Sequence, residues 1–296
     1  MRASTLFLAF ALLALPAAAQ EQAVPHRPDR QVSVELTPWS TTLRVVEDGQ
    51  VVDLREVSTP DLPCGVVEQL GASEGIWAEA KKPKPPTGPQ VVDVLVLYSS
   101  TALQEIGSRE LVIALAESFI GSMNQDIYPG SGVTNLTLRL VGVVSAPWFR
   151  EADAPLTHKA LTKSLKKYGA DVFLVLSGEL EGVCGWGATL VGGIVRWDCG
   201  LGTVSHELGH IFIQGLHDLC FVQCAPERHF ATIECEDASK IPPGCLPESA
   251  DYYSNVTKLL FGLPMGDASH NSAKAVMASA HKVAAIRKPK KPKSSR

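Results

Sequence analysis

The chain has 296 residues, of which 45% are hydrophobic and 20% are charged, so it can bury a sizeable core and is not an intrinsically disordered protein. Its net charge of −4 provides no electrostatic basis for binding nucleic acid. The clear basic run, over 287–293, predicts a solvated tail, which we expect to be disordered over 289–296.

Residues 1–19 have the pattern of a secretory signal peptide. Arg2 precedes an apolar run over 6–15, and small residues follow it up to a cleavage site near Ala19. No other stretch is apolar for the roughly 18 residues that a membrane helix needs. We therefore expect a soluble protein that is secreted or periplasmic, has no membrane partner and can form disulfides.

Two further segments precede the main part of the chain. Residues 20–80 alternate weakly between apolar and polar side chains, which predicts the short strands of a small β-rich segment. Residues 81–89 combine prolines with lysines, as in a stiff and exposed linker. We place the domain boundary at this linker, so that the main domain covers 90–288.

Strands and helices alternate in the first part of the main domain. The β-branched run over 91–98 predicts a strand that is buried on both faces. Apolar residues at every fourth position over 111–127 predict a helix that ends before Pro129. A strand, a helix and a strand follow, over 136–140, 156–168 and 172–176. This order predicts an α/β fold with a mostly parallel, twisted sheet.

The rest of the domain is rich in glycine and cysteine. The segment over 184–202 predicts an antiparallel edge strand and a loop, clamped by a Cys184–Cys199 bridge. A helix from about Thr203, a loop up to Ala250 that is stapled by disulfides, and a helix over 271–288 complete the predicted elements.

Seven cysteines leave one without a partner. Six lie in the C-terminal part and can form three bridges, although the sequence does not determine how they connect. Cys64 lies far from them and is the odd thiol.

The segment His206-Glu207-Leu208-Gly209-His210 carries the clearest chemical signal. On a helix, two histidines four residues apart share one face, about 5–6 Å from each other, and can hold one zinc ion. Glu207 points to the side of this pair, where a carboxylate can act as general base without binding the metal. This pattern is the zincin signature, and its chemistry is hydrolysis.

A catalytic zinc ion needs a third protein ligand and one open position. Gly215 supplies a turn that can bring His217 back to the metal, and the carboxylate of Asp218 is an alternative third ligand.

The region from Val91 to Arg287 resembles the metzincin zinc endopeptidases of the reprolysin-like type, near the bacterial peptidyl-Asp metalloendopeptidases. The stretches that carry this resemblance are 92–98, 131–133 with 138–142, 170–172, 199–210 and 252–256. The resemblance implies an α+β zincin-type fold, a monomer, one catalytic zinc ion and a protein or peptide substrate. It implies that His206, His210 and His217 bind zinc and that Glu207 is the general base. It also implies that the edge strand pairs with an extended substrate, although no substrate-binding residue can be named. The alternative is a glycine-rich hairpin that does not contact the substrate.

This sequence departs from the metzincin pattern at two places. Four residues separate His210 from Gly215 and one separates Gly215 from His217, where the family has two and two, so we expect the helix to run about half a turn further. In Thr232-Ile233-Glu234, Glu234 stands where the family has the methionine of its Met-turn, and Met265 is a poor replacement. A carboxylate buried there is costly unless it is paired or protonated.

The segment Leu62-Pro63-Cys64-Gly65-Val66 resembles the cysteine switch of metzincin prosegments. The resemblance implies that the Cys64 thiolate inhibits the enzyme by occupying the fourth position of the zinc, and that 20–80 is a prosegment. The alternative is an incidental thiol or an intermolecular disulfide.

The sequence therefore predicts a secreted zinc endopeptidase that is made as a zymogen. The alternative is a degenerate, non-catalytic metzincin-like protein that binds zinc or a partner.

Overall fold

The computed structural model describes residues 30–36, 40–58, 88–150, 158–178, 180, 182–189, 191–213, 216–225, 228–235, 241–243, 245 and 248–286. The predicted signal peptide, Cys64, most of the linker and the basic tail lie outside these residues.

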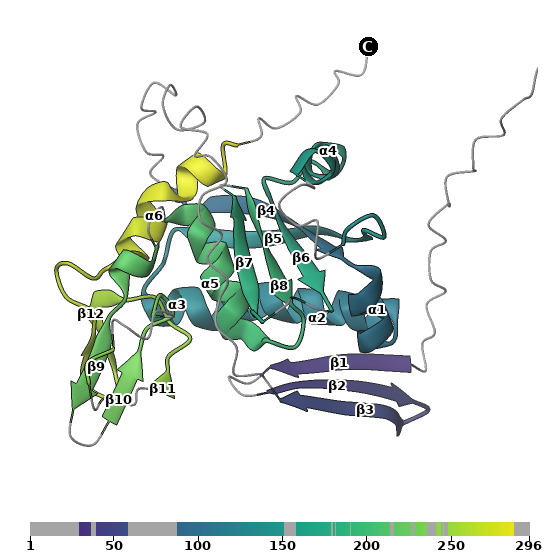
Figure 1. Ribbon diagram of the computed structural model, residues 1–296, viewed down its shortest axis with the longest axis horizontal. Helices are drawn as coiled ribbons and strands as arrows, with labels where there is room; N and C mark the ends of the chain where they lie inside the picture. The colour runs from purple at the N-terminus through teal and green to yellow at the C-terminus, as the bar shows by residue number, and fades with distance from the viewer. Residues whose placement is uncertain are drawn as a thin grey trace, which may run out of the picture.

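A five-stranded sheet forms the centre of the molecule (Figure 1). Its strands, in spatial order, are β5 (Leu136–Ser145), β4 (Gln90–Tyr98), β6 (Val172–Ser177), β8 (Gly192–Arg196) and β7 (Gly185–Thr189). The first four are parallel to one another, and β7 pairs antiparallel with β8 at the edge. The predicted α/β fold with a mostly parallel sheet and an antiparallel edge strand is confirmed.

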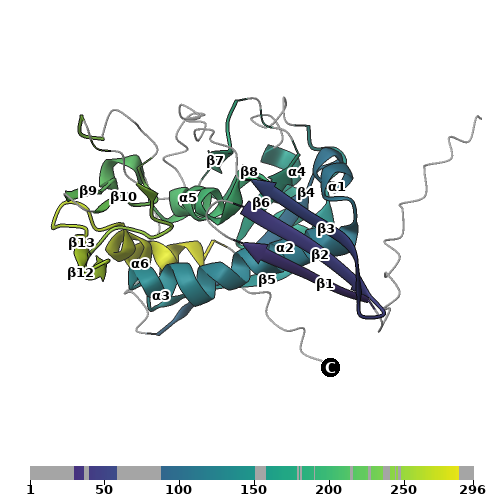
Figure 2. The ribbon, with the colours of Figure 1, turned by 90° about the horizontal axis from the view of Figure 1, so that it is seen from below.

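Helices cover both faces of this sheet, which explains its continuous apolar strands (Figures 1 and 2). Val94 and Val96 of β4 join the larger core, while Leu95 and Leu97 join a second core on the opposite face. The helices that border the larger core are α1 (Ser100–Ile106), α2 (Arg109–Ser122), α5 (Gly200–Phe212) and α6 (Ser272–Val283). On the other face, α4 (His158–Tyr168) packs against the second core.

The helix that begins with α2 does not end before Pro129, so that prediction is wrong. It continues through a π-helical turn, η1 (Met123–Ile127), into α3 (Tyr128–Ser131), and Gly132 ends it with a φ of 79°. Pro129 lies at the start of α3, directly after the π-helical turn.

The cysteine-rich part contains short strands where we expected only loop. Three of them, β9 (Val222–Ala225), β10 (Arg228–Ala231) and β11 (Glu248–Ser249), form a small sheet. A hairpin of β12 (Asn255–Leu260) and β13 (Leu263–Met265) follows. The strands are too short for a visible alternation, and a small apolar cluster and disulfides hold them together.

The six C-terminal cysteines form three disulfides, Cys184–Cys199, Cys220–Cys235 and Cys224–Cys245. Such bonds are typical of secreted or periplasmic proteins. None of the described helices has the length and hydropathy needed to cross a bilayer.

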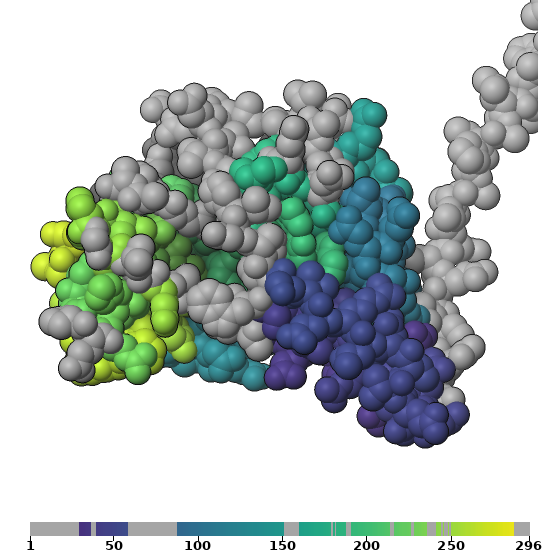
Figure 3. Space-filling view, turned by 60° about the horizontal axis from the view of Figure 1, so that its bottom comes forward, coloured from purple at the N-terminus to yellow at the C-terminus, as the bar shows by residue number. Residues whose placement is uncertain are grey.

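The N-terminal segment forms an antiparallel sheet of β1 (Arg30–Leu36), β2 (Ser40–Glu47) and β3 (Gln50–Ser58), as predicted. It shares the larger core, because Leu43 and Val45 are buried in the same cluster as α2. In Figure 3 this sheet, coloured purple to blue, and the yellow-green C-terminal part form opposite ends of the visible face.

The guanidinium of Arg55 also connects β3 to the core. It donates hydrogen bonds to the carbonyl oxygens of Glu105 and Ile106, at 3.0 and 3.2 Å. These carbonyls end α1, where the helix itself supplies no partner for them.

The burial of Leu43 leads to a stability prediction. Leu43 is 1% exposed, whereas Leu54 of β3 is 58% exposed. We expect Leu43→Ala to lower the free energy of unfolding by about 2–5 kcal/mol and Leu54→Ala to change it by less than about 0.5 kcal/mol. Denaturant unfolding measures both, and equal effects would show that the N-terminal sheet is not part of the core.

Candidate metal centre

Helix α5 places His206 and His210 on one face, as the sequence predicts. Their imidazole centroids lie 4.7 Å apart and their Nε2 atoms 3.0 Å apart. The Cys184–Cys199 disulfide joins the N-cap residue of α5 to the residue that precedes β7. The disulfide therefore links the start of α5 covalently to the start of the edge strand β7.

The chain returns to these histidines through η3 (Leu216–Leu219), a short 3-10 helix that carries His217. The ring of His217 lies 4.9 Å from that of His206 and 5.0 Å from that of His210. One nitrogen atom from each of the three rings lies within 4.8 Å of the others, so the cluster could hold a metal ion. Asp218 is exposed and is not part of this cluster.

The end of α5 differs from our prediction that the helix runs further. It ends at Phe212, and Ile213 is already extended, with φ −126° and ψ 109°. Leu216 is fully buried against Gly209, where a Cβ atom would lie 3.0 Å from Leu216 Cδ2. The early end of the helix and this close packing together allow η3 to fold back onto α5.

A backbone carbonyl orients His206. Its Nδ1 atom lies 2.7 Å from the carbonyl oxygen of Ile233, and both residues are buried. Because a carbonyl oxygen only accepts hydrogen bonds, Nδ1 must carry the hydrogen. The Nε2 atom, which faces His210, is then the one with a free lone pair for a metal.

The surroundings of these histidines favour the neutral imidazoles that bind metals. Burial and the neighbouring His210 lower the pKa of His206 well below its usual range. Burial, together with His217, lowers the pKa of His210 to about 4. Both rings are therefore neutral near neutral pH, which is the form that ligates metal ions.

Glu207 is fully buried beneath the hairpin of β7 and β8. A Cβ atom at Gly185 would collide with its carboxylate, and one at Gly193 would lie 2.8 Å from its Cβ atom. Likewise, a Cβ atom at Gly187 would lie 2.8 Å from the ring of His210. Sequence reasoning missed the role of these glycines, although their density within 184–202 was the available signal.

Burial also raises the pKa of the Glu207 carboxyl well above its usual range. A nearby cation acts in the opposite direction, because it favours the charged carboxylate.

Glu234 is fully buried in the same turn as Ile233, so the cost of burying its carboxylate must be offset. Its carboxylate accepts hydrogen bonds from the Ser254 N–H, at 3.0 Å, and from the Ser272 hydroxyl. Burial nevertheless raises the pKa of Glu234. Met265 lies elsewhere, in the apolar cluster of the small C-terminal sheet.

No protein-family model matches the chain, and no curated protein matches it. A chain from a solved structure, titled "Structure of a chaperone-substrate complex", is similar with a TM-score of 0.54 and 15% sequence identity. The similarity covers 83% of this chain and 39% of that chain, so this chain spans well under half of its length. At this identity the likeness is one of fold alone, and the support for a metal centre comes from the three clustered imidazoles.

Proposed function

We propose that the protein is an exported zinc-dependent endopeptidase of the metzincin type. The observation that carries this proposal is the convergence of His206, His210 and His217, with Glu207 buried beside them under an edge strand. Three histidines and one open position are the ligand set of a catalytic zinc site. The sequence order of His, Glu and His on one helix is what distinguishes it from a structural site.

In the proposed reaction the histidines bind the metal ion and Glu207 transfers the proton. A zinc ion held by the three imidazoles would polarise a peptide carbonyl and make a water molecule more acidic. The carboxylate of Glu207 would accept a proton from the attacking water as the water oxygen bonds to the carbonyl carbon. The same carboxyl would then give that proton to the nitrogen that leaves when the C–N bond breaks.

The edge strand β7 is our candidate for substrate positioning. In the described sheet β7 pairs with β8 on one side, and its other side carries no strand. An extended peptide that pairs with this side gains backbone hydrogen bonds next to Glu207 and His210. We assign no residue to side-chain specificity.

The zymogen remains part of the proposal. Cys64 lies outside the described residues, and its thiolate is our candidate for the ligand that blocks the open position. The segment that would carry it begins with an N-terminal sheet that shares the core of the domain.

Removing the metal tests the proposed function. We expect the full chain to hold about one zinc ion and the Cys64→Ala variant to cleave an unfolded protein substrate. A chelator should abolish cleavage, and added zinc should restore it. Elemental analysis and a gel-based cleavage assay measure the two quantities. If Cys64→Ala binds one zinc ion per chain and cleaves nothing, the non-catalytic alternative is favoured.

A further inference from the structure

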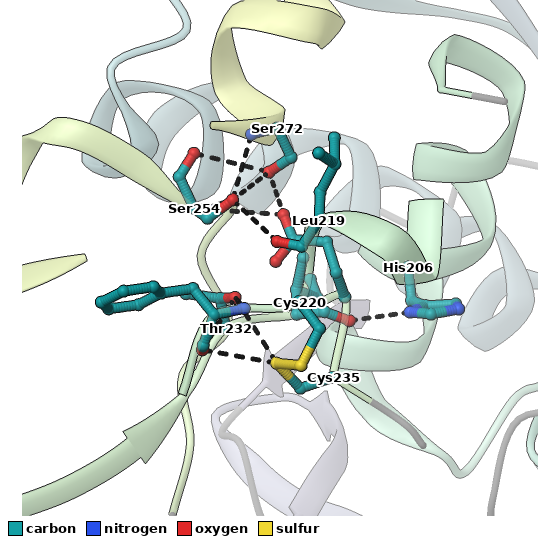
Figure 4. Close-up of a disulfide and its surroundings, with 10 residues drawn as sticks. His206, Leu219, Cys220, Thr232, Cys235, Ser254 and Ser272 are labelled. Carbon is teal, nitrogen blue, oxygen red and sulfur yellow. Dashed lines mark hydrogen bonds between the residues drawn. A yellow bond between two sulfur atoms is a disulfide. The ribbon is translucent and has the colours of Figure 1, made fainter. Parts of the chain in front are cut away.

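We propose that Glu234 and the Cys220–Cys235 disulfide form one positioning device, which fixes two metal ligands, His206 and His217, relative to each other. This inference rests on the proposed metal site but not on peptidase activity. Its parts belong to four segments, around Cys220, Cys235, Ser254 and Ser272, which lie together near His206 (Figure 4).

The first set of contacts connects the turn that contains Glu234 to His206. The Ile233 carbonyl that accepts from His206 belongs to a tight turn, in which the Cys235 N–H donates to the Thr232 carbonyl at 2.9 Å. The Ile233 N–H donates in turn to the Tyr252 carbonyl at 3.0 Å. The position of this turn therefore decides where the His206 ring can point.

The second set of contacts connects Glu234 to the 3-10 helix η3, which carries His217. Ser254, whose N–H donates to Glu234, also donates its hydroxyl to the carbonyl oxygen of Leu219, at 3.2 Å. Leu219 is the last residue of η3, the 3-10 helix that carries His217. Ser272 connects the other two residues, because its hydroxyl donates to the carboxylate of Glu234 and its N–H donates to the hydroxyl oxygen of Ser254. Glu234, Ser254 and Ser272 are all fully buried.

The disulfide joins the same two segments covalently. Cys220 directly follows η3, and Cys235 directly follows Glu234. The turn that orients His206 and the helix that presents His217 are thus linked both by a sulfur bridge and by the hydrogen bonds of Glu234. This link gives a physical reason why His217 reaches the cluster in spite of its unusual distance from His210 in the sequence.

Matched variants separate hydrogen bonding from packing at Glu234. Glutamine keeps an acceptor oxygen for the Ser254 N–H and the Ser272 hydroxyl, whereas methionine keeps a similar length and lacks that oxygen. We expect Glu234→Gln to bind zinc within about 3-fold of the parent protein. Glu234→Met should weaken binding by about 10–100-fold, the range seen when residues that orient metal ligands are changed.

The disulfides supply a second matched pair. The Cys220–Cys235 and Cys224–Cys245 bonds span 15 and 21 residues, so their loss should affect the unfolded chain similarly. Only the first adjoins the segments that hold metal ligands. We expect Cys220→Ser/Cys235→Ser to weaken zinc binding by about 10–100-fold and Cys224→Ser/Cys245→Ser to leave it within about 3-fold.

The experiment uses the full chain in a Cys64→Ala background, so that no free thiol competes for the metal. Competition with a chromophoric chelator gives the zinc affinity, and the visible absorption of bound cobalt(II) reports the ligand geometry. Thermal unfolding is followed by circular dichroism. Glu234→Met and Cys220→Ser/Cys235→Ser should change the cobalt spectrum, while Glu234→Gln and Cys224→Ser/Cys245→Ser should not. If Glu234→Met does not fold, Ser272→Ala takes its place and should change the spectrum in the same way.

A parental protein that binds cobalt, with variants whose spectra match it, would overturn the positioning device and leave the proposed metal site intact. The same holds if the loss of affinity simply follows the loss of thermal stability across all variants. A parental protein that binds no metal would instead overturn the metal site itself.

Discussion

Replacing Glu207 with glutamine is expected to lower the rate of peptide-bond hydrolysis by about 10²–10⁴-fold while leaving zinc bound, because glutamine cannot take up the proton of water. Glutamine suits this test because Glu207 fills a tight space beneath Gly185 and Gly193, which a smaller side chain would leave empty. The ratio kcat/KM for a cleaved peptide, measured in the Cys64→Ala background together with the zinc content, provides the comparison.

The matched control for Glu207 is Glu117→Gln. Glu117 is exposed on α2, so the same chemical change there should leave hydrolysis within about 2-fold, as for surface substitutions in general. Equal rates for the Glu207 and Glu117 variants, with zinc present in both, would refute the general-base role.

Replacing His217 with alanine is expected to weaken zinc binding by more than about 100-fold. The loss should exceed the 10–100-fold typical of residues that only orient ligands, because a direct ligand is removed. Its neighbour Asp218 provides the control, since it is exposed and lies outside the cluster of imidazole nitrogens. Asp218→Ala should bind zinc as tightly as the parent protein.

Competition with a chromophoric chelator measures both affinities. The opposite result, with Asp218→Ala losing the metal and His217→Ala retaining it, would identify the carboxylate as the third ligand. The sequence alone allowed both residues, and the cluster geometry favours His217.

The parts of the fold that the sequence predicted well are those with strong local signals. The strand over 91–98 and the strand β6, which is apolar up to Ser177, are the kind of run that a sheet covered on both faces can bury. The strands β9 to β11 and the hairpin of β12 and β13 have no such signal, because each is short and depends on contacts between distant residues. The π-helical turn before Pro129 was missed for a related reason, since a proline usually ends a helix.

The candidate metal site also has a part that the sequence predicts and a part that it does not. Two histidines and a glutamate within five residues of one helix are visible in the sequence, because the helix alone fixes their geometry. The position of the third histidine, His217, depends on where α5 ends and on how η3 packs against Gly209, and no local sequence pattern reveals either. The hydrogen bonds of Glu234 reach residues 20 and 38 positions away in the sequence, so its partners could not be predicted.

Two disulfides flank the segment that carries the three histidines, one at the N-cap of α5 and one directly after η3. In a reducing compartment both bonds are open, and only His206 and His210 are held together by a single helix. If the three histidines hold a metal ion, its affinity should therefore depend on oxidation of these two bonds, because reduction would release the connection between α5 and η3.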